Sequence, residues 1–209
     1  MHIELTEMLR CPESHREDVL VLSTGEMMGR MVRFGIVGCP VCRKEFLITN
    51  GIVDFTGEGT GEGGRGRSGA TLPSSPVPPP PGDPQALQAL LELSGPGGFV
   101  TLLGDAARYA VGLANLMAGI HFIGINAPPD VEELPVLSLL RTQTVIPLRQ
   151  SIARGVVVGR DLATSSWLVE AHRVLLRGRR FVALHETPEL PIGLEKLAVA
   201  KGLWVGAKK

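Results

Sequence analysis

The second half of the chain alternates short apolar runs with segments of helical spacing. The apolar runs predict strands over residues 98–104, 120–125, 143–147, 155–159, 180–184 and 203–206. The segments between them predict helices over 84–93, 106–118, 134–140, 165–176 and 192–201. Strands that are apolar throughout and separated by helices are typical of the α/β class, with a doubly wound, mostly parallel, Rossmann-like sheet covered on both faces.

Residues 1–56 have a different pattern, with apolar or alternating runs at 19–22, 31–37, 45–48 and 52–55. Asn50 and Gly51 separate the last two runs, and Asn-Gly between apolar runs predicts a β-hairpin. A module of this size buries too little surface for a large core. We therefore expect a small β domain in which a bound metal supplies a main part of the folding free energy.

Gly-rich and then Ser/Pro-rich sequence separates these two parts. Residues 57–84 carry almost no apolar side chains and end in a run of four prolines and a glycine at 78–82. Such a composition predicts a disordered or polyproline-like linker. The chain is thus expected to consist of a small β domain (1–56), a linker (57–84) and an α/β domain (85–209).

The three cysteines of the chain all lie in the N-terminal part, as Cys11 and the pair Cys39 and Cys42. His15 follows Cys11 at a spacing that makes it a natural fourth ligand, and zinc prefers four nitrogen or sulfur ligands in a tetrahedron. Three alternatives stay open: a changed ligand set, a site with three protein ligands, and a metal-free relic in which His15 is a solvated turn histidine.

Composition narrows the function classes. Basic and acidic residues balance at 21 each and only 4% of residues are aromatic, which disfavours strong non-specific nucleic-acid binding and base stacking. The N-terminus lacks the pattern of a signal peptide, and the apolar stretch 99–125 is interrupted by charged residues. With cysteines spaced for a metal rather than for disulfides, we expect a soluble, cytoplasmic protein.

The N-terminal segment resembles the small zinc-ribbon family whose best-known member activates tRNA and protein methyltransferases as a partner subunit. The resemblance rests on residues 9–12, the knuckle 38–42 and the ending 45–53, about a quarter of the chain. The family's usual first knuckle is C-P-x-C, and here Ser14 stands at the second cysteine position. The resemblance implies a zinc-bound module that docks on a protein partner.

The C-terminal part resembles class I S-adenosylmethionine-dependent methyltransferases. The resemblance rests on residues 155–161 and 168–184, which look like the family's fourth strand, the helix that follows it and the entry to its fifth strand, with Arg179 in place of a glycine. The alternating pattern indicates six strands, without a clear seventh. Another doubly wound α/β domain is the alternative, because alternation of strands and helices is common.

The residues that the resemblance assigns to the cofactor are Gly104, Asp105 and Asn126. The first loop keeps one glycine, Gly104, and has Leu102 where the family has an acidic residue. Asn126 stands where the family has the carboxylate that holds both ribose hydroxyls. An amide accepts such a hydrogen bond without charge assistance. We therefore expect an eroded pocket, in which S-adenosylmethionine binding is doubtful.

Other polar residues that follow predicted strands are Asp161, His185 and Glu186. They are candidate acid/base groups, although polar residues that end strands and cap helices are the commoner case. The cluster of Arg173, Arg177, Arg179 and Arg180 suits either an RNA or acidic partner, or plain solvation.

We assign no catalytic residue and interpret the chain as a non-catalytic zinc-binding, methyltransferase-like subunit that scaffolds a larger protein assembly. A divergent methyltransferase with its activator fused in cis is the alternative, and a nucleic-acid-binding ribbon tethered to an α/β domain is a weaker one.

Overall fold

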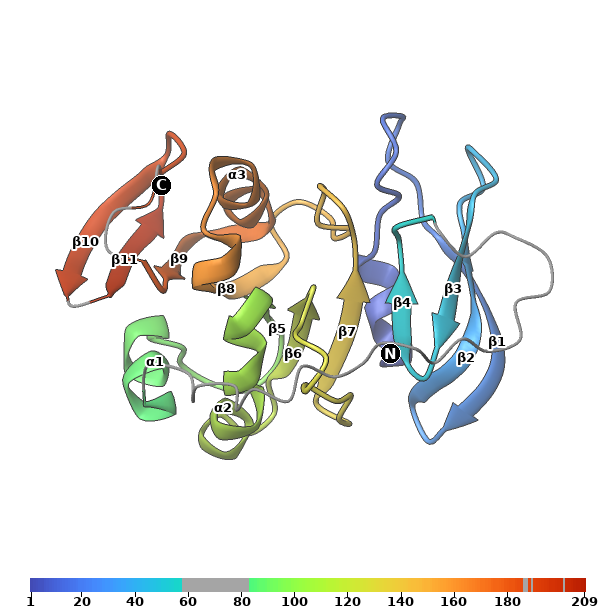
Figure 1. Cartoon of the computed structure of the whole chain (residues 1–209), viewed down its shortest axis with the longest axis horizontal. Coiled ribbons are helices and arrows are strands. Elements are labelled where there is room, and N and C mark those ends of the chain that lie inside the picture. Colours follow the sequence, from blue (N-terminus) through green and yellow to red (C-terminus); the bar gives the residue numbers. More distant parts are fainter. Residues whose placement is uncertain (58–82, 186–187, 189, 201) are drawn as a thin grey trace.

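The computed structural model describes residues 1–57, 83–185, 188, 190–200 and 202–209. Eleven strands of this part of the chain form one mixed sheet in the order β1-β2-β3-β4-β7-β6-β5-β8-β9-β11-β10 (Figure 1). The predicted linker falls almost entirely outside the described residues. The two parts that the sequence separates are joined instead through their strands, and the sheet runs without a break across both.

The strands are β1 (Val21–Met28), β2 (Met31–Gly38), β3 (Glu45–Thr49), β4 (Ile52–Asp54), β5 (Phe99–Leu103), β6 (His121–Ile125), β7 (Leu137–Arg141), β8 (Ala153–Val158), β9 (Leu175–Ala183), β10 (Leu194–Ala200) and β11 (Leu203–Lys208). The helices are α1 (Pro84–Leu91), α2 (Ala110–Leu116) and α3 (Ser165–Val174), with short 3-10 helices η1 (Ile3–Met8), η2 (Gly104–Tyr109) and η3 (Arg160–Leu162). No described helix has the length and apolar character needed to cross a bilayer.

Strands β1 to β4 form an antiparallel ribbon, in which each strand pairs with the next along the chain. The predicted hairpin is confirmed: Asn50 and Gly51 both have positive φ, the conformation that a two-residue hairpin turn requires. Val37, Phe46 and Val53 are buried on one face of the ribbon, whereas Phe34 and Leu47 on the other face are exposed. Within the described part of the chain, the ribbon therefore packs on one side only.

A parallel strand pair joins the ribbon to the α/β sheet. Residues Ile52–Asp54 of β4 align with Leu139–Arg141 of β7. Beside this seam the backbone NH of His2 donates to Ser138 Oγ (2.8 Å), which also lies 2.9 Å from His121 Nε2. Burial lowers the pKa of His121 to about 4, so its ring is neutral at pH 7 and sits in the seam without the cost of a buried charge.

The α/β part consists of the parallel strands β7-β6-β5-β8-β9, followed by β11 and β10 in antiparallel pairing. The prediction that a seventh strand is missing was wrong, because β10 and β11 complete seven strands. The helix predicted at 192–201 is strand β10. Leu194, Leu197 and Ala198 have helical spacing, but pairing with β11 overrides that local preference.

Two further element predictions were wrong at the centre of the sheet. The helix predicted at 134–140 is largely strand β7, which is held between β4 and β6. The edge strand predicted at 143–147 is an irregular loop. A short apolar run suits either type of element, and here the choice depends on β4, a strand far away in the sequence.

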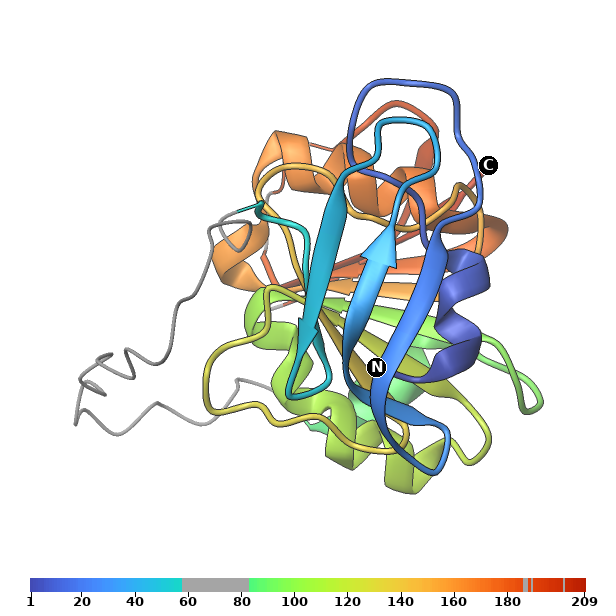
Figure 2. The ribbon, with the colours of Figure 1, turned by 90° about the vertical axis from the view of Figure 1, so that its right-hand side faces the viewer.

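Side chains from the two faces of the sheet belong to two cores. In β5, Val100 and Leu102 pack with helices α1 and α2, whereas Leu103 packs with η1 and α3. Figure 2 shows α3 on one side of the sheet and the α1/α2 pair on the other. This covering of both faces over the parallel strands confirms the predicted Rossmann-like α/β class.

Candidate functional site

The cysteine knuckles and the predicted cofactor loops lie along the same edge of the sheet. Strand β3 runs antiparallel to β4, so the turn between β2 and β3, which holds Cys39 and Cys42, lies at the carboxyl end of β4 and β7 (Figure 1). Gly104, Asn126 and Gly159 directly follow β5, β6 and β8 at this same carboxyl edge. In open α/β sheets this is the edge where ligands bind.

The four predicted metal ligands converge. Cys11 Sγ lies 3.7 Å from Cys42 Sγ, and His15 Nε2 lies 3.4 Å from Cys39 Sγ. All four donor atoms lie within 4.8 Å of one another. Four sulfur and nitrogen ligands around one zinc ion at 2.0–2.3 Å are separated by about 3.3–3.8 Å, so this donor set fits a tetrahedral ion.

Hydrogen bonds around the cluster prepare its donor atoms for a cation. His15 Nδ1 lies 2.7 Å from the Arg16 carbonyl oxygen, which only accepts; Nδ1 therefore carries the proton and Nε2 presents its lone pair. Burial opposes ionisation of Cys39, but backbone amides of Cys42 and Val41 donate to its sulfur and lower its pKa to about 7. Burial raises the pKa of Cys11 to about 12. A bound divalent cation would favour the thiolate form of both cysteines, despite the difference between their pKa values.

In the loops that follow β5 and β8, the aspartate of each loop accepts a hydrogen bond from the backbone of the other. Asp161 Oδ1 accepts a hydrogen bond from the backbone NH of Asp105 (3.0 Å), and Asp105 Oδ1 accepts one from the backbone NH of Arg160 (3.0 Å). Each carboxylate lies against a glycine of the other loop. A Cβ atom on Gly104 would lie 2.2 Å from Asp161 Oδ1, and one on Gly159 would lie 1.9 Å from Asp105 Oδ1. The space that the glycines leave open is filled by the protein itself.

The side chain of Asn126 is also bound to another residue of the protein. Its Nδ2 donates to the Thr142 carbonyl oxygen and its Oδ1 accepts from the Thr142 backbone NH, both at 2.9 Å. Its positive φ of 50° turns the side chain back toward the end of β7. Both polar atoms of the amide are therefore used in tying β6 to β7.

The described residues consequently do not fit S-adenosylmethionine at the position where the resemblance places it. The amide expected to bind the ribose binds Thr142, and the glycine loop holds the carboxylate of Asp161. Burial, and then the charge of Asp161, raises the pKa of Asp105. This carboxylate pair opposes the approach of any further anionic group to the loop.

The remaining candidate residues from the sequence do not form one common site within the described part of the chain. His185 directly follows Leu184 just beyond β9, at the same edge of the sheet, and Glu186 lies outside the described residues. Arg173 binds Glu170, and Arg180 binds Glu92, so neither is a free positive charge. Sequence reasoning missed Glu170 and the hydrogen bonds between the loops that follow β5 and β8. Paired glycines that each follow a strand and precede an aspartate within two residues are the signal that marks these hydrogen bonds.

Neither a protein-family model nor a curated protein sequence matches the chain. Among solved structures, it is similar to a chain of the complex between the Haloferax volcanii Trm112 methyltransferase activator and a protein described as a methyltransferase: 21% identity, TM-score 0.39, covering 48% of this chain and 50% of that one. The chain thus spans half the length of that neighbour.

Two further structures match more of their own length. The antibiotic-resistance methyltransferase Kmr shares 13% identity at a TM-score of 0.43, covering 60% of this chain and 92% of Kmr. A methyltransferase from Aquifex aeolicus, described as dependent on S-adenosylmethionine, shares 15% identity at a TM-score of 0.44, with 60% and 88% covered. These neighbours are methyltransferases of the Rossmann-like fold, and at these identities the likeness concerns the fold alone.

Proposed function

We propose that this protein is a non-catalytic, zinc-binding, methyltransferase-like subunit that serves as a scaffold in a larger protein assembly of the cytoplasm. The observation that carries the proposal is the contrast along one edge of the sheet. Four metal-ligand atoms converge there, whereas the glycine loop that follows β5, several strands farther along, is filled by Asp161. The fold is retained, and the residues that would hold the cofactor have other partners.

Zinc is the metal that the donor set favours. Three thiols and one imidazole form a soft, four-coordinate set without a position for water, which is typical of a structural zinc site rather than a catalytic one. Cys11 and Cys39 are buried in a core that also includes Ile146 and Leu148 of the α/β part. Zinc would therefore stabilise the fold and carry no chemistry of its own here.

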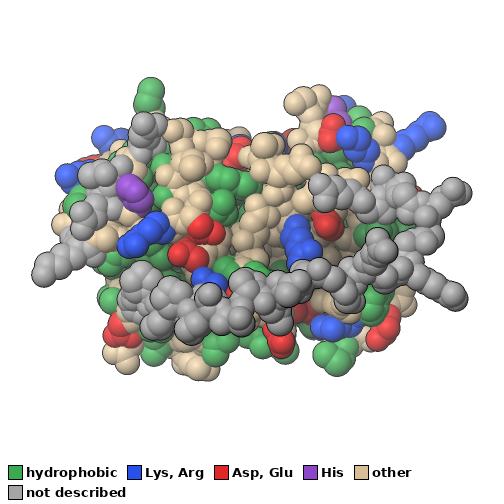
Figure 3. Space-filling view, in the orientation of Figure 1, with side chains coloured by type: hydrophobic (Ala, Val, Ile, Leu, Met, Phe, Trp, Pro, Cys, Tyr) green, Lys and Arg blue, Asp and Glu red, His purple; other side chains and the backbone are tan. Residues whose placement is uncertain are grey.

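The proposed scaffold offers to a protein partner the outer face of β1–β3, which is uncovered as far as the described residues go. Val21, Phe34 and Leu47 project from β1, β2 and β3 and are 61%, 40% and 38% exposed. Figure 3 shows a neighbouring face of the molecule, and in its described part acidic and basic side chains are interspersed. An apolar surface with mixed charges suits a protein partner better than a polyanion such as RNA.

Calorimetric titration with S-adenosylmethionine and with S-adenosylhomocysteine tests the absence of a working cofactor site. We expect no heat of binding by the zinc-loaded full chain at ligand concentrations in the millimolar range. Micromolar binding that disappears in Asn126→Ala would overturn the non-catalytic reading and establish a cofactor site.

A second experiment tests the scaffold role. The full chain serves as bait in extract of its native source, beside a variant in which Phe34→Glu and Leu47→Glu place charges on the uncovered face. We expect one protein to be recovered in stoichiometric amount with the unchanged chain and lost with the variant. Equal recovery by both baits would place the partner elsewhere, and no stoichiometric protein would contradict the scaffold role.

A further inference from the structure

The segment that precedes Cys11 is paired with a loop of the α/β part. Leu9 and Leu148 form an antiparallel bridge, and both are fully buried. On either side of this bridge the backbone NH of Arg10 donates to the Pro147 carbonyl oxygen (3.1 Å), and the backbone NH of Arg149 donates to the Met8 carbonyl oxygen (2.8 Å). The first metal ligand is therefore one residue away from a fixed contact with the other part of the molecule.

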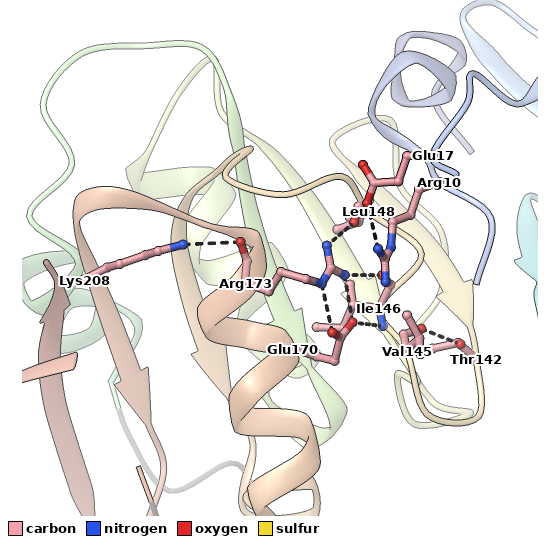
Figure 4. A network of polar contacts seen from close by, with 9 residues as sticks. All are labelled: Arg10, Glu17, Thr142, Val145, Ile146, Leu148, Glu170, Arg173 and Lys208. Atoms are coloured by element: carbon pink, nitrogen blue, oxygen red, sulfur yellow. Dashed lines mark hydrogen bonds and ion pairs between the residues drawn. The ribbon is translucent and has the colours of Figure 1, made fainter. Parts of the chain in front are cut away.

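The same loop is held from its other side by helix α3. Arg173 donates to the carbonyl oxygens of Ile146 and Leu148, both at 2.8 Å, and Glu170 accepts from the backbone NH of Ile146 at 2.9 Å (Figure 4). Arg173 and Glu170 also bind each other at 2.7 Å. Only 18% and 15% of their side chains are exposed, which makes these charge-assisted bonds stronger than surface pairs.

The loop makes a tight turn around Pro147, in which the backbone NH of Leu148 donates to the Ile146 carbonyl oxygen (2.7 Å), and its carbonyl groups face two sides. The carbonyls of Ile146 and Leu148 face α3, and the carbonyl of Pro147 between them faces Arg10 next to the metal knuckle. A displacement of the knuckle backbone must therefore move the loop, and a displacement of the loop must break contacts with Arg173.

We propose that residues 146–148 couple the metal knuckle to helix α3, so that metal binding at Cys11, His15, Cys39 and Cys42 orders α3 as well as the ribbon. This inference rests on the proposed metal site. It makes Glu170 and Arg173 positioning residues for a site to which they contribute no ligand.

The two tryptophans provide a direct test, because both lie in the α/β part. Trp167 is on α3 and Trp204 is on β11. Zn²⁺ is titrated into the chelator-treated full chain carrying Trp204→Phe, which leaves Trp167 as the reporter, and into the matched Trp167→Phe protein. We expect the emission of Trp167 to change in step with zinc occupancy and that of Trp204 to respond much less.

Arg173→Lys keeps the positive charge but cannot bind two carbonyl groups at once. In the Trp204→Phe background it should reduce the response of Trp167 by at least about twofold at unchanged zinc content. An undiminished response in Arg173→Lys would overturn the coupling. Equal responses of Trp167 and Trp204, with loss of the far-UV circular dichroism, would overturn it too, because the whole chain would then be unfolding.

Hydrogen exchange tests the same coupling without a substitution. The backbone amides of Ile146 and Arg149 should exchange about tenfold more slowly in the zinc-loaded chain than in the chelated one. Unchanged exchange at both amides would contradict the coupling while leaving the metal site intact. Purified protein that takes up no zinc at all would instead refute the metal site on which the coupling rests.

Discussion

The metal knuckle and the glycine loop lie on one edge of one sheet, but their polar side chains have different partners. At the knuckle, four ligand atoms from two loops point at a common centre. At the glycine loop, each carboxylate accepts from the backbone of the other loop, and the centre is filled. The difference teaches that polar groups at one edge of a sheet are available to a ligand only where they have no partner within the protein.

Loss of one thiolate should have the largest effect. Cys39→Ser removes a buried ligand, and zinc content by elemental analysis should fall from about one ion per chain to less than about a tenth, with a clear loss of thermal stability. The matched control is Ser14→Ala, which changes the exposed neighbour of His15 and should keep both zinc and stability. Equal zinc contents in the two variants would mean that the knuckle is not the metal site.

A methyl group added in the glycine loop should destabilise the protein less than loss of a thiolate does. It should destabilise it more than backbone strain alone. Gly104→Ala places Cβ against Asp161 at a φ of +59° and should lower the free energy of unfolding by about 2–4 kcal/mol. Gly178→Ala is the control, since its φ of +71° is similar but nothing lies within 4 Å, and it should cost about 1–2 kcal/mol.

The excess cost of Gly104→Ala should shrink when Asp161→Gly is added, because the carboxylate that it meets is gone. Urea unfolding of the single and double variants measures this coupling. Additive costs would contradict the direct contact between Gly104 and Asp161.

Restoring the carboxylate that the family resemblance expects should destabilise the protein. In Asn126→Asp, one oxygen can still accept from the Thr142 backbone NH, but the other faces the Thr142 carbonyl oxygen with no proton between them. We expect a loss of about 1–3 kcal/mol by urea unfolding at pH 7. Asn115→Asp, at an exposed position of α2, is the control and should change stability little. Neutral behaviour of Asn126→Asp would show that the amide is not needed where it lies.

The smallest expected effect concerns pH. Because the pKa of Asp105 is raised in the fold by burial and by Asp161, its contribution to stability is present below its unfolded value and is lost as pH rises through the folded value. Asp105→Asn should therefore be more stable than the unchanged chain at pH 7, by less than about 1 kcal/mol, with the advantage shrinking toward pH 4.

Asp130 provides the control of opposite sign. Its hydrogen bond with Arg108 lowers its pKa, so Asp130→Asn should lose stability at pH 7. Parallel pH profiles for the two asparagine variants would mean that the charges of Asp105 and Asp161 do not interact.

The sequence predicted the parallel strands, and it predicted that Cys11, His15, Cys39 and Cys42 lie together, for a simple reason. Cysteines at knuckle spacing and strands that are apolar on both faces are local signals. Strands β7 and β10 were not predicted because pairing with neighbouring strands determines their secondary structure. For β7 one of these neighbours, β4, lies in the other part of the chain. The hydrogen bonds of Asp105 and Asp161 were not predicted because they depend on how two loops face each other.

The parallel pair of β4 and β7 also has a consequence for the order in which the protein is made. Ile52 aligns with Leu139, which follows it by 87 residues (139 − 52). At typical rates of synthesis, about 4–17 s pass between the synthesis of β4 and that of its partner β7, and one edge of β4 is unpaired during this time. Strand β4 spans only Ile52–Asp54, and such a short edge offers little backbone to a wrong neighbour. The strand that joins the two parts is thus short enough to resist wrong pairing until β7 is available.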